Sequence, residues 1–121
     1  MEPIVVEGVV TQGRKLGRRI GFPTANVAVS SDLQAEDGVY RSRIEVGGVW
    51  YDGMSNLGYN PTVGGNERRL ETHIFDFEGE IYGLEIRVEL CEKIRDEQTF
   101  SSVDELCEQI NKDKAYILKY R

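Results

Sequence analysis

The segment GRKLGRRIGFPTAN, residues 13–26, contains the densest group of side chains that could handle a phosphate. Its three glycines allow the backbone to approach a ligand closely and to turn its amides toward phosphate oxygens. Four basic side chains add positive charge: Arg14, Lys15, Arg18 and Arg19. The spacing of a Walker A loop is absent, and so are the HRD and DFG motifs. The segment therefore predicts either a phosphate-binding loop of another kind or a glycine-rich connection between strands.

A candidate metal-binding pair ends the same segment. Pro23 stiffens the chain directly before Thr24 and Asn26, which project to the same side if the chain is extended. A neutral hydroxyl and a neutral carboxamide oxygen alone bind Mg²⁺ poorly, but they become adequate ligands when substrate phosphates supply anionic oxygens. We therefore consider this pair as ligands of a magnesium ion held jointly with a nucleotide.

The carboxylate that begins ETHIFDF, residues 71–77, is a candidate general base. Period-two alternation predicts one face with Glu71, His73, Phe75 and Phe77 and the opposite face with Thr72, Ile74 and Asp76. A carboxylate at the head of an apolar strand face can take a proton, because burial tunes its pKa. The alternative is a structural glutamate paired with Arg68 or Arg69. His73 is the only histidine, which leaves no histidine-based relay or metal site, and we expect it to be structural.

Two further segments could shape a site. In RDEQTF, residues 95–100, Arg95 and Phe100 could hold a flat heterocycle by stacking and hydrogen bonding. The alternative is a solvated connection that ends in a buried phenylalanine. SNLGYNPTVGG, residues 55–65, is rich in turn-forming residues and predicts a loop beside the site or a simple turn.

The elements that must position these residues are mostly strands. Residues 1–11 are rich in β-branched side chains and predict a strand that Gly8 interrupts, as a bulge would. Residues 12–26 predict a long structured loop. Two hairpins are expected to follow, one around Gly47–Gly48 and one around Glu78–Gly79. Since no strand–helix–strand alternation occurs, the order favours an antiparallel sheet or a small closed barrel.

Only the C-terminal segment has helical periodicity. Apolar side chains recur there at three- and four-residue steps: Val103, Leu106, Cys107, Ile110, Ile117 and Leu118. Ser102 and Glu105 fit a capping box at the start of this helix. We expect the helix to pack on the barrel as a cover for one end.

Composition limits the classes of protein that remain. With 121 residues, 40% of them hydrophobic, the chain suits one globular domain over residues 1–121. The net charge of −6 argues against a nucleic-acid or anionic-membrane partner. No secretory signal and no bilayer-spanning stretch is visible, and Cys91 and Cys107 lack metal-ligand spacing. We expect a cytoplasmic monomer with two reduced thiols rather than a disulfide.

Taken in order, the motifs resemble those of the riboflavin kinase family. GRKLGRRIGFPTAN is similar to that family's signature loop, and DGVY, NPT, ETHIFDF, IYG and RDEQTF follow at similar spacing. The similarity runs from about residue 6 to about residue 114 and is closest to the kinase half of bacterial bifunctional riboflavin kinase/FAD synthetases. Gln12 and Gln98 depart from the common pattern, which has His and a longer basic side chain there.

The resemblance implies a fold and an activity. The fold is a six-stranded antiparallel Greek-key barrel with a C-terminal helix. The activity is transfer of the γ-phosphoryl group of ATP to the ribityl 5′-hydroxyl of riboflavin, which gives FMN and ADP and requires Mg²⁺. Because the nucleotidyltransferase half of the bifunctional enzymes is absent from these residues, FAD synthesis is expected to be absent too. A flavin-binding carrier or sensor that kept the barrel but not turnover is the alternative, and a purely structural role would explain these motifs less well.

The same resemblance assigns roles to single residues. Glu71 corresponds to the catalytic base, and Thr24 and Asn26 correspond to the Mg²⁺ ligands. The residues that match nucleotide-contacting positions are Gly13, Arg18, Gly21, Pro23, Ile74, Asp76 and Tyr82. The residues that match flavin-contacting positions are Arg95, Gln98 and Phe100.

Overall fold

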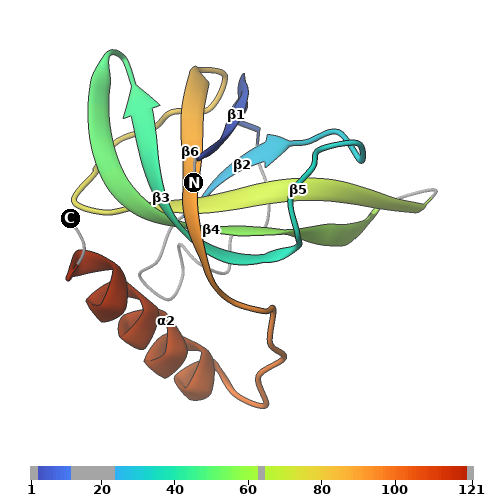
Figure 1. Ribbon diagram of the computed structural model, residues 1–121, viewed down its shortest axis with the longest axis vertical. Coiled ribbons are helices and arrows are strands. Elements are labelled where there is room, and N and C mark those ends of the chain that lie inside the picture. The colour runs from blue at the N-terminus through green and yellow to red at the C-terminus, as the bar shows by residue number, and fades with distance from the viewer. Residues whose placement is uncertain (1–2, 12–23, 63–64, 120–121) are drawn as a thin grey trace.

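The computed structural model describes residues 3–11, 24–62 and 65–119, with the side chains of residues 60–62 left undescribed. Within these residues the chain forms strands and one C-terminal helix (Figure 1). The strands are β1 (Ile4–Val9), β2 (Ala25–Ala28), β3 (Gly38–Val46), β4 (Val49–Thr62), β5 (Gly65–Ile74) and β6 (Glu85–Arg95), and the helix is α2 (Val103–Leu118).

The six strands form one antiparallel sheet in the order β1-β6-β3-β4-β5-β2. Hairpins join β3, β4 and β5, and β6 returns to lie beside β3, which is the Greek-key arrangement. The two edge strands then approach each other, because the amide of Thr11 donates a hydrogen bond to the carbonyl oxygen of Asn26 at 2.8 Å. The sheet thus curls into a nearly closed barrel, and the predicted fold is confirmed.

Gly8 permits this closure and does not form a bulge. Its register with Ile86 continues without a break along the β1–β6 pair, so the bulge expected at this position is wrong. A Cβ atom added at Gly8 would instead collide with the side chain of Val27 on β2. The glycine is therefore needed where the two edge strands come close together.

The strand pairing corrects one of the two predicted hairpins. Gly47 and Gly48 have φ angles of 57° and 84° and form the tight turn between β3 and β4, as predicted. The hairpin expected around Glu78–Gly79 is wrong, because β5 pairs with β4 and β2 and not with β6. Residues 55–62, expected to be a turn-rich loop, are strand and form the first arm of a β4–β5 hairpin.

The barrel interior is filled by apolar side chains from every strand. Inward-facing and outward-facing residues alternate, so Ile44, Leu57 and Leu70 are completely buried. The remaining buried members of this interior core are Val6, Val10, Ala25, Val27, Tyr40, Ile74, Ile86, Val88 and Leu90.

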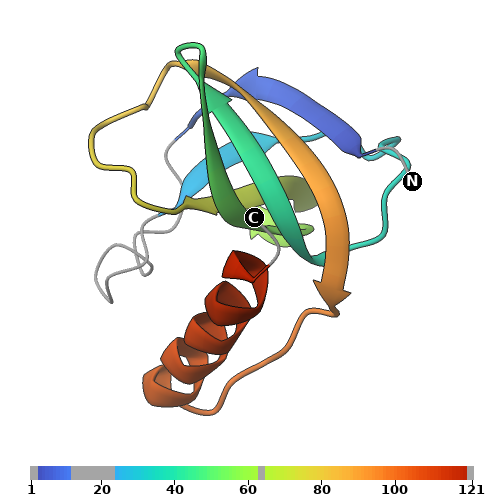
Figure 2. The same cartoon turned by 60° about the vertical axis from the view of Figure 1, so that its left-hand side comes forward.

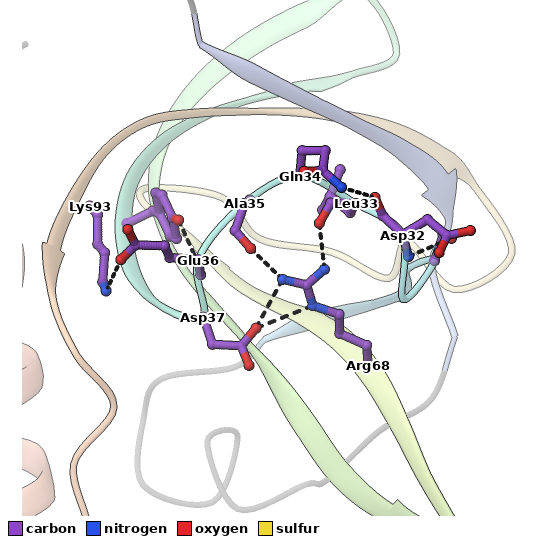
Figure 3. Close-up of polar contacts among 10 residues, drawn as sticks. Asp32, Leu33, Gln34, Ala35, Glu36, Asp37, Arg68 and Lys93 are labelled. Atoms are coloured by element: carbon purple, nitrogen blue, oxygen red, sulfur yellow. Dashed lines mark hydrogen bonds and ion pairs between the residues drawn. The ribbon is translucent and has the colours of Figure 1, made fainter.

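One end of the barrel is covered by the connection between β2 and β3, residues 29–37. Leu33 and Ala35 of this connection pack against the interior core. The buried guanidinium of Arg68 donates hydrogen bonds to the carbonyl oxygens of both residues, and it pairs with Asp37 at 3.0 Å (Figure 3). A single arginine of β5 thus fixes a connection that has no regular secondary structure.

Helix α2 lies along the outside of the barrel (Figure 2). Its Ile117 packs in a second core with Val39, Met54 and Phe75, and this core is separate from the interior core. Val39 and Met54 alternate with the inward-facing residues of their strands, so they face outward. The helix is therefore packed on the barrel as expected, but it covers an outer face rather than an end.

The predicted N-cap of α2 is confirmed in part. The hydroxyl of Ser102 accepts a hydrogen bond from the amide of Glu105 at 3.2 Å. The Glu105 carboxylate reaches back to the amide and hydroxyl of Ser101, at 3.2 and 2.8 Å, instead of to Ser102. Cys91 and Cys107 are free thiols, as expected. In the part of the chain that the structure describes, no helix has the length and apolar character needed to cross a membrane.

Candidate active site

A cavity of about 360 Å³ opens beside β2 and β5. Three residues expected at a nucleotide or metal site line it: Thr24, Ile74 and Tyr82. Much of the remaining wall comes from the connection between β5 and β6, including Phe77, Glu78 and Glu80. The cavity is large enough for a heterocyclic ring system.

Glu71 lies between two asparagines on the outer face of the barrel. In the antiparallel registers, Asn26 of β2 is opposite Glu71 on one side, and Asn56 of β4 is opposite it on the other. Directly opposed residues of neighbouring strands bring their side chains to the same face at contact distance. Thr24 and Ala25 line the cavity, and the next residue, Asn26, lies opposite Glu71. The start of β2 therefore lies between the cavity and Glu71.

The side-chain oxygen of Asn26 is a buried acceptor in need of a partner. Asn26 is 2% exposed, and its Oδ1 atom has no hydrogen-bond partner within the described residues. A buried polar atom in this state is costly unless a ligand, an ion or water satisfies it. A carboxamide oxygen next to a carboxylate is suited to a hard cation, so these residues fit a bound Mg²⁺.

Glu97 is a second carboxylate at Glu71 that the motifs did not single out. Both residues line a small pocket of about 30 Å³ with Arg69, and the Glu97 carboxylate lies against Gly58, where a Cβ atom would collide with it. Partial burial, followed by the negative charges of Asp37 and Glu71, raises the pKa of Glu97 above its ordinary value. The only feature of the sequence that could have indicated Glu97 as a site residue is its position within RDEQTF.

Arg95 is tied to helix α2. Its Nε atom donates to both carboxylate oxygens of Asp113, at 3.1 and 3.0 Å, and its Nη2 atom donates to Oδ2 at 2.8 Å. Asp113 is buried on the helix, so this pair joins the end of β6 to α2. Gln98 and Phe100 lie on the connection between these two elements, Gln98 exposed and Phe100 half-buried. Arg95 therefore sets where that connection begins.

The alternation predicted for residues 71–77 holds only as far as Phe75. Glu71 and His73 face outward and Thr72 and Ile74 face the interior, as predicted. Asp76 then adopts a φ of 56° and turns the chain, so Phe77 packs against the interior core instead of sharing the face of Glu71. Asp76 itself is exposed and does not line the large cavity.

Several predicted site residues lie outside the described part of the chain. They are Gly13, Arg18, Gly21 and Pro23 of the phosphate-binding segment, and Gln12 lies there too. Of the two arginines considered as partners of Glu71, Arg68 pairs with Asp37 and Arg69 pairs with Glu67 at 2.9 Å. His73 contacts the ring of Phe75, with 5.5 Å between the ring centroids.

This arrangement defines the chain as a β-barrel protein with a cavity in the barrel wall. Comparison with known protein families identifies the class more specifically. The sequence model of the family described as "Flavokinase: Riboflavin kinase" matches residues 1–121. The chain belongs to the riboflavin kinase family.

Two relatives and two solved structures illustrate the match. The bifunctional riboflavin kinase/FMN adenylyltransferase of Bacillus subtilis is 42% identical over 98% of this chain and 39% of its own length. A B. subtilis protein called RNA-binding riboflavin kinase RibR is 40% identical over 95% of this chain and 50% of its own length. The chain thus spans half or less of the length of these two relatives.

The first solved structure is titled a macrolide-efflux protein from Streptococcus pneumoniae. It matches with a TM-score of 0.88 and 38% identity, over 98% of this chain and 40% of that chain. The second is riboflavin kinase from Trypanosoma brucei, with a TM-score of 0.67 and 21% identity over 98% of this chain and 80% of that one. The second match shows a shared fold.

Proposed function

We propose that this chain is an ATP- and Mg²⁺-dependent riboflavin kinase that forms FMN and does not form FAD. The observation that carries the proposal is that Glu71 lies opposite Asn26, whose buried side-chain oxygen has no hydrogen-bond partner within the described residues. Their neighbours Thr72 and Ala25 line a cavity of nucleotide-base size. The family gives the substrates, riboflavin and ATP. We expect the chain to act in the cytoplasm as a monomer, and its net charge of −6 disfavours a nucleic-acid partner.

Glu71 is the proposed general base. Its carboxylate takes the proton of the ribityl 5′-hydroxyl while the 5′-oxygen attacks the γ-phosphorus of ATP. The bond from that phosphorus to the bridging oxygen breaks as the new bond forms, and ADP leaves. Phosphoryl transfer requires mainly alignment and charge neutralisation, so one carboxylate is enough for the proton.

Thr24 and Asn26 are the residues that would hold Mg²⁺ together with the ATP phosphates. The ion, when bound, neutralises charge on the transferring phosphoryl group. The backbone of Asn26 is held in place for this role. Its main-chain carbonyl oxygen accepts a hydrogen bond from the amide of Thr11, and its strand pairs with β5. Gly13, Arg18, Gly21 and Pro23 are proposed to cover the phosphates.

The flavin is proposed to lie against the connection between β6 and α2. Phe100 supplies an aromatic surface for stacking, and Gln98 supplies hydrogen bonds. Arg95 forms an ion pair with Asp113, so its proposed role in flavin binding is to position this connection as well as to contact the flavin ring. Ile74, Asp76 and Tyr82 are the remaining proposed nucleotide contacts.

The experiment that tests the function combines purified protein with riboflavin, ATP and Mg²⁺ and separates the flavins by chromatography. FMN without FAD is the expected result. Tight riboflavin binding with no FMN would instead support the alternative, a flavin-binding carrier or sensor. FAD in the product would contradict the proposed restriction to the kinase step.

Removal of the proposed metal ligands should raise the Mg²⁺ requirement. We expect Thr24→Ala and Asn26→Ala each to increase the Mg²⁺ concentration for half-maximal rate by roughly tenfold or more, the scale on which even indirect support of a metal ligand matters. Asn56→Ala is the matched control, because Asn56 flanks Glu71 from the other side and is exposed. An unchanged Mg²⁺ dependence in the Thr24 and Asn26 variants would remove both residues from the metal site.

A further inference from the structure

The carboxylate of Glu97 lies on the same outer face of the barrel as the proposed base, Glu71. Position 56 of β4 is opposite Glu71 and position 58 is opposite Arg69, so a side chain at either position points to the face of Glu71. Gly58 has no side chain, and the atoms nearest to the place that its Cβ atom would take belong to the carboxyl group of Glu97. Glu97 therefore fills the space that this glycine leaves open beside Glu71.

The Glu97 carboxylate lies among groups that disfavour its charge. Partial burial, and then the negative charges of Asp37 and Glu71, raise its pKa above the ordinary value. Within the described residues, no hydrogen bond or ion pair of this carboxylate offsets these effects, and the neighbouring guanidinium of Arg69 pairs with Glu67 at 2.9 Å. A charged acceptor in such surroundings is stabilised when a ligand brings a hydrogen-bond donor to it.

Glu71 can be reached from two sides on this face. Strand β5, which carries Glu71, has β2 on one side and β4 on the other. The proposed metal ligands Thr24 and Asn26 are on the β2 side, whereas Glu97 lies over β4. If the ATP phosphates approach with the metal from the β2 side, the β4 side is left for the substrate that carries the hydroxyl group. Its ribityl chain then passes Glu97 on the way to Glu71.

The pocket that both carboxylates line fits a single hydroxyl group. Its volume of about 30 Å³ is enough for a water molecule or a hydroxyl group and too small for a ring. Because Glu71 and Glu97 both border it, a neutral donor is favoured there and an anion is disfavoured. The ribityl chain presents neutral donors of this kind, the hydroxyl groups on its 2′, 3′ and 4′ carbons.

We propose that Glu97 is a specificity-determining residue for the flavin, because its carboxylate accepts a hydrogen bond from a secondary hydroxyl group of the ribityl chain. The inference rests on the proposed kinase function, which supplies riboflavin as the ligand. The bond gives Glu97 the donor that the described residues do not supply, and it holds the ribityl chain with its 5′-hydroxyl at Glu71. Flavins with a hydroxylated side chain are thus preferred to flavins without one.

The test compares riboflavin with its 2′-, 3′- and 4′-deoxy analogues and with lumiflavin, which has a methyl group in place of the ribityl chain. Dissociation constants are measured by flavin fluorescence for the full chain and for Glu97→Ala. We expect Glu97→Ala to bind riboflavin roughly tenfold more weakly than the wild-type protein, the scale of a hydrogen bond to a charged group, and to bind lumiflavin unchanged. One deoxy analogue should show the same loss in the wild-type protein and no further loss in Glu97→Ala.

Asp96→Ala is the matched control. Asp96 precedes Glu97 in the same connection, but its exposed carboxylate pairs with Lys93 at 2.7 Å. An exposed ion pair of this kind contributes little, so both flavins should bind Asp96→Ala within about twofold of wild type. A loss of riboflavin affinity in Asp96→Ala equal to that in Glu97→Ala would assign the effect to the connection as a whole and contradict the inference.

Two further results would overturn it. The first is equal binding of riboflavin and all three deoxy analogues by the wild-type protein, a measurement that needs no variant to fold. The second is a folded Glu97→Ala protein, verified by its melting temperature, in which riboflavin and lumiflavin lose the same affinity or neither loses any. If the wild-type protein forms FMN in either case, only the role of Glu97 falls. If it neither binds riboflavin nor forms FMN, the proposed function falls and the role of Glu97 falls with it.

Discussion

Replacing Glu71 by glutamine should reduce the rate of FMN formation by roughly two to four orders of magnitude while leaving riboflavin bound. Glutamine keeps the size of the side chain and its place between Asn26 and Asn56, but it cannot accept the proton of the attacking hydroxyl. The loss should therefore appear in kcat, with little change in the riboflavin dissociation constant measured by flavin fluorescence.

Glu67→Gln is the matched control for this experiment. Glu67 lies on the same strand and the same outward face four residues earlier, and its carboxylate pairs with Arg69 at 2.9 Å. We expect its kcat to remain within a few-fold of wild type, since a partly exposed ion pair contributes little. A Glu71→Gln enzyme that turns over as fast as Glu67→Gln would show that another group takes the proton.

Most strand positions could be predicted from the sequence, but of the strand pairings only that of β3 with β4 could. The pair Gly47–Gly48 located the turn between β3 and β4. Residues 55–62 were misjudged because Gly58 and Pro61 are typical of turns. Pro61 is tolerated since β3 pairs with β4 only as far as Leu57, so the missing amide of Pro61 leaves no bond to β3 unmade. Glycine is preferred at position 58 because the carboxylate of Glu97 lies against it, a contact that only the folded chain reveals.

The same limit applies to the candidate site. The proximity of Glu71 to Asn26 depends on β2 pairing with β5, which no local pattern specifies. Glu97 reaches Glu71 from a connection beyond β6, and Asp113 captures Arg95 across 18 residues. Residue types therefore indicated which chemistry is available, and the long-range contacts determine which groups meet.

Replacing Arg68 by methionine should destabilise the barrel by about 3 kcal/mol, or lower its melting temperature by about 10 °C. The substitution keeps an apolar side chain of similar length but leaves the carbonyl oxygens of Leu33 and Ala35 and the carboxylate of Asp37 without this donor. Arg68→Lys should recover only part of the loss, because an ammonium group cannot reproduce the planar fork that bonds all three residues.

The contrast with a surface pair makes this prediction specific. Arg87 pairs with Glu7 at 3.1 Å, and both side chains are about half exposed, so Arg87→Met should cost well under about 1 kcal/mol. Denaturant unfolding of the two methionine variants measures the difference directly. If both lose the same small amount, the connection over residues 29–37 is held by the packing of Leu33 and Ala35 and not by Arg68. Arg68→Met could instead be less stable than Arg87→Met and still have the wild-type kcat at temperatures below its melting point. Arg68 would then support the barrel end and take no part in phosphoryl transfer.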